Sequence, residues 1–154
     1  MMAEPIFDLE CFSAAETEAA GAHLAGCMKQ MSLPRFVALC GGLGAGKTAF
    51  TRGFCSVMCP GAAVRSPSFA IVNEYRGEPD VYHFDVWRIK DDDDLYSTGF
   101  YDYAARKGII ICEWADSISY ALPESYVKVS IEGDGDTPRH IVAEIIKGDD
   151  GNRC

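Results

Sequence analysis

Two stretches of the chain are continuously apolar. The first is Phe36-Val37-Ala38-Leu39-Cys40, and the second is Ile109-Ile110-Ile111-Cys112, which ends in Glu113-Trp114. Runs of this length without polar alternation are typical of parallel strands covered on both faces. Residues 47 to about 58 are Gly-poor and amphipathic, so we expect a helix directly after the first of these strands.

Alternating polar and apolar positions predict the remaining strands. We expect an edge strand at 6–10 and two antiparallel hairpins, one joining 69–75 to 81–88 and the other joining 126–131 to 140–146.

Two further helices are predicted from apolar positions that repeat at helical spacing. The first covers 14 to about 31, is capped by Ser13, and has an inward stripe of Ala20, Leu24, Cys27 and Met31. The second covers about 92–106 and starts in the acidic run 91–94, which suits the positive end of a helix. Its predicted inward residues are Leu95, Phe100, Tyr103 and Ala104; Gly99 interrupts the pattern and Gly108 ends it.

Size and charge limit the possible functions. The chain has 154 residues, with 14 basic and 23 acidic side chains and a formal charge of −9. Such a surface repels free nucleic acid, which disfavours tight RNA binding by the chain alone but not a role inside a complex. There is no apolar run long enough for a membrane span and no signal-peptide pattern, and the seven cysteines lack C-x-x-C pairing. We therefore expect a cytoplasmic protein with reduced thiols and no membrane partner.

A glycine-rich motif follows the first buried strand. Gly41-Gly42-Leu43-Gly44-Ala45-Gly46-Lys47-Thr48 fits G-x-x-x-x-G-K-[ST], the P-loop pattern, between a predicted strand and a predicted helix. Such a loop cradles phosphates with backbone N–H groups, the lysine neutralises the β- and γ-phosphates, and the threonine hydroxyl binds Mg²⁺. The Ser13–Thr17 end of the preceding helix is a weaker candidate for contact with the base. The residues expected to bind the nucleotide are Gly42, Leu43, Gly44, Ala45, Gly46, Lys47, Thr48 and Ala49.

Two acidic residues are candidates for the chemistry beside the phosphates. Glu113 ends a buried strand, where ligands of open α/β sheets bind, and we interpret it as a partner of Mg²⁺ or a general base; the alternative is a capping acid for the next loop. Asp85 stands between Phe84 and Val86, and burying it requires a cation or hydrogen-bond donors. Asp85 is therefore a candidate to contact a metal-bound water or orient the attacking water, unless it lies on an exposed strand face. His83 shares its face and is more simply explained as a structural histidine.

The segment Ser66-Pro67-Ser68 follows the P-loop helix. P-loop proteins often place a switch segment there, and its hydroxyls could reach the γ-phosphate or the attacking water; an ordinary serine-capped turn is the alternative. Together these motifs predict one α/β domain over 1–154, with residues 147–154 as a polar tail. We expect a P-loop NTPase-like, three-layer fold: a mixed, mostly parallel central sheet with antiparallel hairpins, and helices on both faces.

The order of these motifs resembles the bacterial TsaE family of ATPases, which serve threonylcarbamoyladenosine modification of tRNA. The resemblance covers nearly the whole chain. Three positions depart from the family pattern: Gly42 replaces a usual Asp, Ser68 a usual Thr, and Trp87 a usual Tyr. The matching segments are 41–48, Thr51-Arg52-Gly53, Ser66-Pro67-Ser68-Phe69, 82–88, 99–103, Glu113-Trp114 and Leu122-Pro123.

The resemblance implies an ATP- and Mg²⁺-binding subunit that works with the proteins TsaB and TsaD. That complex makes N6-threonylcarbamoyladenosine at position 37 of tRNAs that read codons beginning with A. TsaD carries out the chemistry on tRNA, and the ATPase supports turnover and meets tRNA only through the complex. The resemblance assigns phosphate and metal binding to Lys47 and Thr48, metal binding to Glu113, and catalytic or coupling roles to Asp85, Ser68 and Trp114.

Hydrolysis by the isolated chain is expected to be slow, because no arginine lies within the P-loop or the Ser66–Ser68 stretch. Arg52, Arg65, Arg88 or a partner could supply one. Two other functions are kept open. A small-molecule kinase would need an acceptor pocket and usually an arginine-bearing lid. A nucleotide-gated binding module would need ATP only to order the Ser66–Ser68 loop.

Overall fold

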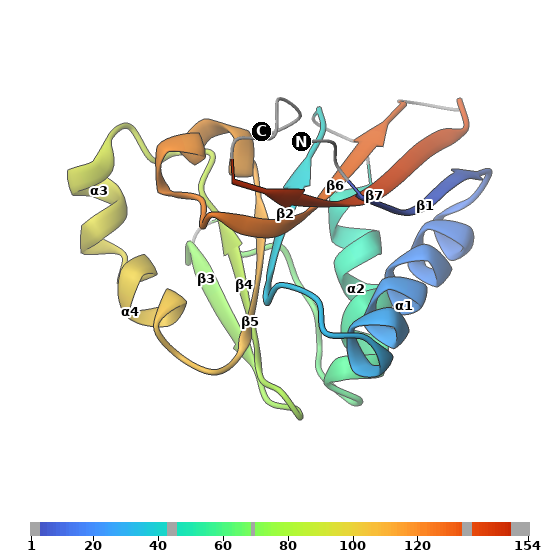
Figure 1. Cartoon of the computed structure of the whole chain (residues 1–154), viewed down its shortest axis with the longest axis horizontal. Coiled ribbons are helices and arrows are strands. Elements are labelled where there is room, and N and C mark those ends of the chain that lie inside the picture. Colours follow the sequence, from blue (N-terminus) through green and yellow to red (C-terminus); the bar gives the residue numbers. More distant parts are fainter. Residues whose placement is uncertain (1–3, 43–45, 69, 134–136, 149–154) are drawn as a thin grey trace.

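One twisted sheet runs through the molecule, seen in a computed structural model that describes residues 4–42, 46–68, 70–133 and 137–148 (Figure 1). Within these ranges seven strands pair in the order β1-β7-β6-β2-β5-β4-β3. The four central strands β6, β2, β5 and β4 are parallel, whereas β1–β7, β7–β6 and β4–β3 pair antiparallel. The strands are β1 Glu4–Cys11, β2 Phe36–Cys40, β3 Val72–Tyr75, β4 Val81–Asp85, β5 Ile109–Glu113, β6 Ser125–Glu132 and β7 Arg139–Lys147.

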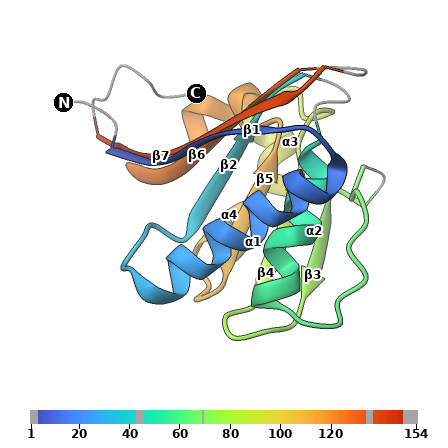
Figure 2. The same cartoon turned by 90° about the vertical axis from the view of Figure 1, so that its right-hand side faces the viewer.

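Helices cover both faces of the sheet and complete three layers. The helices α1 (Ala14–Gln30) and α2 (Lys47–Met58) lie side by side on one face, as Figure 2 shows. The short helices α3 (Asp92–Ser97) and α4 (Phe100–Ala104) and the 3-10 segment η1 (Ala115–Ala121) cover the other. Each face has its own apolar core. The predicted α/β class, the parallel centre of the sheet and the helices on both faces are confirmed.

Close packing of α1 on α2 depends on two glycines. A Cβ added to Gly53 would lie 1.7 Å from the Glu18 carbonyl oxygen, and one added to Gly21 would lie 2.0 Å from the Phe50 carbonyl oxygen. The two helix backbones therefore touch directly. The start of α1 is set by Ser13, whose hydroxyl accepts the Glu16 N–H at 3.1 Å, as predicted from the sequence.

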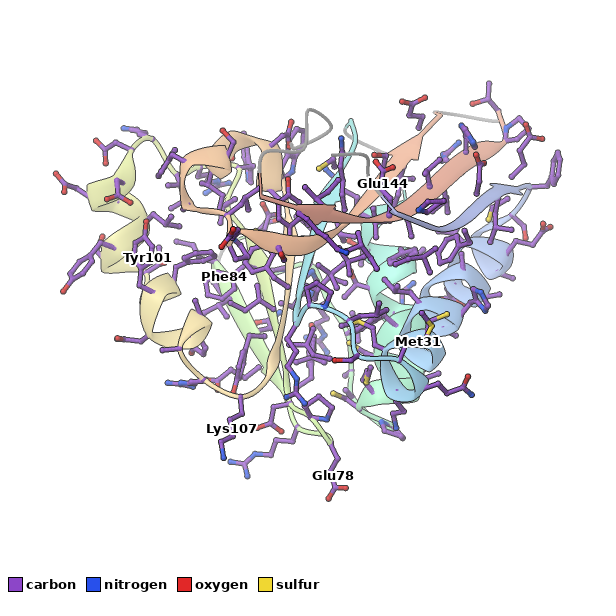
Figure 3. All side chains as sticks on the ribbon, in the orientation of Figure 1. Met31, Glu78, Phe84, Tyr101, Lys107 and Glu144 are labelled. Atoms are coloured by element: carbon purple, nitrogen blue, oxygen red, sulfur yellow. The ribbon has the colours of Figure 1, made fainter. Side chains whose placement is uncertain are left out.

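The predicted helix at 92–106 is wrong in one respect, because it is two short helices. Gly99 has φ 84° and separates α3 from α4; a left-handed residue cannot continue a right-handed helix. Leu95 and Phe100 are buried as expected, but Ala104 is exposed. Figure 3 shows Phe84 between the sheet and α4, where its ring lies 5.3 Å from that of Phe100.

Other boundaries differ slightly from the predictions. The β4 strand ends at Asp85, so Trp87 lies outside it and is half exposed. Met31 lies one residue beyond α1 and is exposed rather than part of the stripe. Lys147 belongs to β7 rather than to a tail; residues 149–154 lie outside the described residues, and the single-domain boundary stays a prediction.

Two structural findings bear on the expected environment. Across the described residues, no helix combines the length and apolar character needed to cross a membrane. Six cysteines in the described part of the chain are free thiols: Cys11, Cys27, Cys40, Cys55, Cys59 and Cys112.

Candidate functional site

The site is built at the N-terminus of α2. Gly46 precedes the helix with φ 99°, a left-handed conformation that favours glycine, and its carbonyl accepts the Phe50 N–H at 3.0 Å. Thr51 closes the first turn with a hydroxyl bond of 2.9 Å to the Lys47 carbonyl. This twelve-residue helix carries the positive end of its dipole where the motif predicts phosphate. Leu43, Gly44 and Ala45 lie outside the described residues.

The Lys47 side chain is buried at the edge of the sheet. Its Nζ donates to the Gly41 carbonyl at 3.0 Å and lies 3.6 Å from the centre of the Trp114 ring. Burial lowers the pKa of Lys47, and the negative charges of Glu113, Asp85 and Asp116 oppose that effect. A carbonyl and an aromatic face offset only part of the free energy that it costs to remove the Lys47 ammonium from water. An anion near Gly46 would therefore stabilise this charge.

Two buried carboxylates face this lysine from adjacent parallel strands. Asp85 ends β4, Glu113 ends β5, and the two residues are register partners; Glu113 is also opposite Leu39 of β2, two residues before Gly41. Both side chains are about 5% exposed or less. The site therefore lies at the carboxyl ends of three neighbouring strands, where the sequence predicted it.

Asp85 is held by two donors. Its Oδ1 accepts the Trp87 N–H at 3.1 Å, and its Oδ2 accepts the Ser68 hydroxyl at 3.3 Å. Burial raises the pKa of the Asp85 carboxyl, and the neighbouring Glu113 raises it further, although the two hydrogen bonds act in the opposite direction. The exposed-face alternative for Asp85 is therefore wrong, and its ionised form needs a nearby cation.

His83 contacts Glu113 directly. Its Nε2 lies 2.6 Å from Glu113 Oε2, and its Nδ1 lies 3.3 Å from the Tyr75 hydroxyl. The imidazole is fully buried. Sequence reasoning assigned His83 a structural role and missed this contact; the available signal was that His83 and Asp85 share one face of a strand that ends at the site.

The Ser66–Ser68 segment lies beside Asp85, and its role as a switch stays a prediction. The Ser66 and Ser68 hydroxyl oxygens are 2.7 Å apart, and Ser68 reaches Asp85. The backbone just before this segment is also fixed, because the Arg65 N–H donates to the Tyr75 hydroxyl at 3.2 Å.

The remaining predicted nucleotide contacts flank Lys47 in the sequence and differ in exposure. Thr48 and Ala49 are half-buried and Gly42 is exposed. A cavity of 270 Å³ opens beside Gly46 and Ala49, between the start of α1 and the β6–β7 turn. Its other lining residues are Cys11, Phe12, Ser13, Ala14, Thr17, Thr137 and Arg139. The Ser13–Thr17 end of α1 thus lies next to the phosphate-binding motif.

The three candidate arginines differ in their surroundings. Arg52 pairs with Glu18 at 3.2 Å. The Arg88 guanidinium lies 5.1 Å from the centre of the Trp87 ring. Arg65 is exposed and directly precedes the Ser66–Ser68 segment, whose Ser68 contacts Asp85.

Comparisons with known proteins identify the family of the chain. Residues 11–141 match the family described as "Threonylcarbamoyl adenosine biosynthesis protein TsaE". The tRNA threonylcarbamoyladenosine biosynthesis protein TsaE of Bacillus subtilis is 37% identical over 114 residues, 73% of this chain and 68% of the relative. The Treponema pallidum protein of the same name is 31% identical over 68% of this chain and 78% of its own.

A relative in Haemophilus influenzae and one solved structure complete the comparison. The Haemophilus TsaE is 37% identical over 62% of this chain and 61% of its own. The crystal structure of Bacillus subtilis YdiB superposes with a TM-score of 0.73 at 28% identity, covering 95% of this chain and 88% of that one. The chain belongs to the TsaE family of threonylcarbamoyladenosine biosynthesis proteins.

Proposed function

We propose that this chain is the Mg²⁺-dependent ATPase subunit of the family's pathway, acting with TsaB and TsaD to form N6-threonylcarbamoyladenosine at position 37 of tRNAs that read codons beginning with A. One observation carries the proposal: Lys47, at the start of α2, lies among the buried carboxylates of Asp85 and Glu113. A cation for phosphates and two acids for a metal and water are the parts that phosphoryl transfer requires.

The side chains at the site suit Mg²⁺. This ion prefers oxygen ligands and is usually held by one or two carboxylates together with substrate phosphates. Thr48 would supply a hydroxyl and Glu113 a carboxylate. Two adjacent buried acids facing one lysine leave local negative charge that a divalent cation offsets, which agrees with the raised pKa of Asp85. When bound, the ion would neutralise charge on the β- and γ-phosphates.

The protein's own groups would then divide the work. Lys47 leaves the Gly41 carbonyl for the γ-phosphate and stabilises the charge of the transferring phosphoryl group. Asp85, fixed by Ser68 and the Trp87 N–H, orients the attacking water. The cavity beside Gly46 and Thr17 accepts the nucleoside end of ATP.

Slow hydrolysis by the chain alone follows from the placement of its arginines. Arg52 pairs with Glu18 and Arg88 stacks on Trp87, whereas an arginine at the transferring phosphate accelerates such reactions by about 10³–10⁵-fold. We propose that docking on TsaB and TsaD either supplies that cation or moves Arg65 into place.

The test is ATP hydrolysis by the purified chain, alone and with TsaB and TsaD. A low rate that rises at least tenfold with the partners supports the proposal, whereas a rate unmoved by partners that stimulate another TsaE contradicts it. Lys47→Met should abolish hydrolysis and weaken nucleotide binding. Lys107→Met is the matched control, because Lys107 is exposed at the opposite end of the sheet (Figure 3). Full activity in cells with Asp85→Ala or Glu113→Ala would indicate a binding module instead of an ATPase.

A further inference from the structure

A line of hydrogen bonds connects Glu113 to the backbone of Arg65, the residue before the Ser66–Ser68 segment. Glu113 Oε2 bonds His83 Nε2 at 2.6 Å, His83 Nδ1 bonds the Tyr75 hydroxyl at 3.3 Å, and that hydroxyl accepts the Arg65 N–H at 3.2 Å. The three side chains come from three neighbouring strands, β5, β4 and β3. His83 is fully buried and Tyr75 is 7% exposed.

Each nitrogen and hydroxyl in this line has a partner. Both imidazole nitrogens of His83 are engaged, one with Glu113 and the other with the Tyr75 hydroxyl. That hydroxyl accepts the Arg65 N–H and donates to the Arg65 carbonyl at 3.1 Å. The same carbonyl also accepts from the Asn73 side-chain amide at 3.2 Å. A fully satisfied buried network holds its members in one arrangement.

The line also gives the two oxygens of the Glu113 carboxylate different roles. Oε2 is committed to His83, so Oε1 is the oxygen left to engage a ligand. Any rotation of the carboxylate must therefore move or break a buried 2.6 Å bond. At its other end, the same line reaches Arg65. Three residues later, the Ser68 hydroxyl donates to Asp85.

We propose that His83 and Tyr75 are positioning residues that couple ligand binding at the Glu113 carboxylate to the position of the loop formed by residues 65–68. The proposal rests on the function proposed above, because it needs Mg²⁺ and nucleotide to engage Glu113. Binding at Glu113 fixes the imidazole, the imidazole fixes the Tyr75 hydroxyl, and the hydroxyl holds the Arg65 peptide. The position of the loop beside Asp85 therefore depends on whether Glu113, on the neighbouring strand, has bound a ligand.

The test is the hydrogen-exchange rate of the Arg65 amide, which reports on its bond to Tyr75. The rate is measured by NMR with and without Mg²⁺ and the non-hydrolysable β,γ-imido analogue of ATP. In the wild-type protein the analogue should slow this exchange by about fivefold, the factor expected from strengthening one hydrogen bond.

Tyr75→Phe removes the link to the loop and leaves His83 on Glu113. Its Arg65 amide should exchange faster without nucleotide and should no longer slow on adding the analogue, while affinity for the analogue stays within about threefold, since less than one hydrogen bond's worth of binding is lost. Tyr103→Phe is the matched control. It removes a 2.9 Å hydroxyl bond to Glu74, the residue before Tyr75, but lies outside the line, and it should behave as the wild type.

Three results would overturn the coupling. The first is equal slowing of Arg65 amide exchange in Tyr75→Phe and wild type, which indicates direct contact between the loop and the nucleotide. The second is no slowing in a wild-type protein that binds the analogue, and the third is a Tyr103→Phe response like that of Tyr75→Phe. If the wild-type protein does not bind the analogue, the proposed function itself fails and the coupling falls with it. If Tyr75→Phe does not fold, His83→Gln breaks the line at another link, since a glutamine amide can bond Glu113 but cannot also reach the Tyr75 hydroxyl from the same position. It should likewise lose the slowing, and retained slowing contradicts the coupling.

Discussion

Gly53→Ala tests the contact on which the position of α2 depends. The added Cβ would lie 1.7 Å from the Glu18 carbonyl oxygen, 2.5 Å from its carbon and 2.7 Å from its Cα. These are backbone atoms, so no rotamer change relieves the clash, and α1 must move away from α2. Overpacking of this kind costs about 3 kcal/mol, the upper part of its usual range, even after the ~1 kcal/mol that Ala gains over Gly within a helix.

The assay is thermal unfolding followed by circular dichroism, with Gly26→Ala as the matched control. For a domain of this size, about 3 kcal/mol corresponds to a Tm lower by roughly 6–12 °C. Gly26 lies in α1, and a Cβ added to it would meet nothing within 4 Å, so Gly26→Ala should raise Tm by about 2 °C. A Gly53→Ala protein as stable as the wild type would refute the reasoning that the two backbones touch. The variant should also bind ATP more weakly, because α2 carries Lys47.

Three further outcomes are expected. Lys47→Met should weaken ATP binding at least about 100-fold by calorimetry, since a desolvated lysine–phosphate contact of ~3 kcal/mol is lost; unchanged affinity would remove Lys47 from the phosphate site. Asp85→Asn should raise Tm, because a neutral side chain no longer bears the burial cost that raises the pKa of this carboxyl, and the same variant should lose partner-stimulated hydrolysis; a lower Tm contradicts the electrostatic argument. His140 Nε2 lies 2.6 Å from the Asp8 carboxylate, and this hydrogen bond raises the pKa of His140 above 6.5. Its stabilisation of the β1–β7 edge is present below pH 6.5 and declines as pH rises through the raised pKa, so His140→Gln should flatten the dependence of Tm on pH above 6.5, and an unaltered profile would count against it.

Local pattern was enough to locate most elements and the main site residues. The apolar runs at 36–40 and 109–112 were interpreted correctly as buried strands because burial on both faces demands apolar residues at adjacent positions. The motif between Gly41 and Thr48 correctly placed the start of α2, and phosphate binding by it stays a prediction. Asp85 was recognised for a similar reason, since a carboxylate between Phe84 and Val86 conflicts with its neighbours.

Contacts set by strand order could not be predicted in the same way. His83 and Glu113 are thirty residues apart, and they meet only because β4 pairs with β5 in a register that no local signal encodes. Tyr75 joins them from the antiparallel partner of β4. The break at Gly99 was visible as a weak point, but its φ of 84° depends on how α3 and α4 each pack on the sheet.

The pairing of β1 with β7 also sets an order of assembly on the ribosome. Glu4 lies opposite Ile145 and Cys11 opposite Arg139, so β1 waits for β7 to be synthesised before the two strands can pair. The cavity beside Gly46 likewise combines Cys11 and Thr17 with Arg139, which is synthesised more than a hundred residues later. A nascent chain that stops before β7 therefore carries Lys47, Asp85 and Glu113 yet lacks part of the wall of the cavity proposed for the nucleotide, so on that proposal ATP binding has to wait until β7 is made.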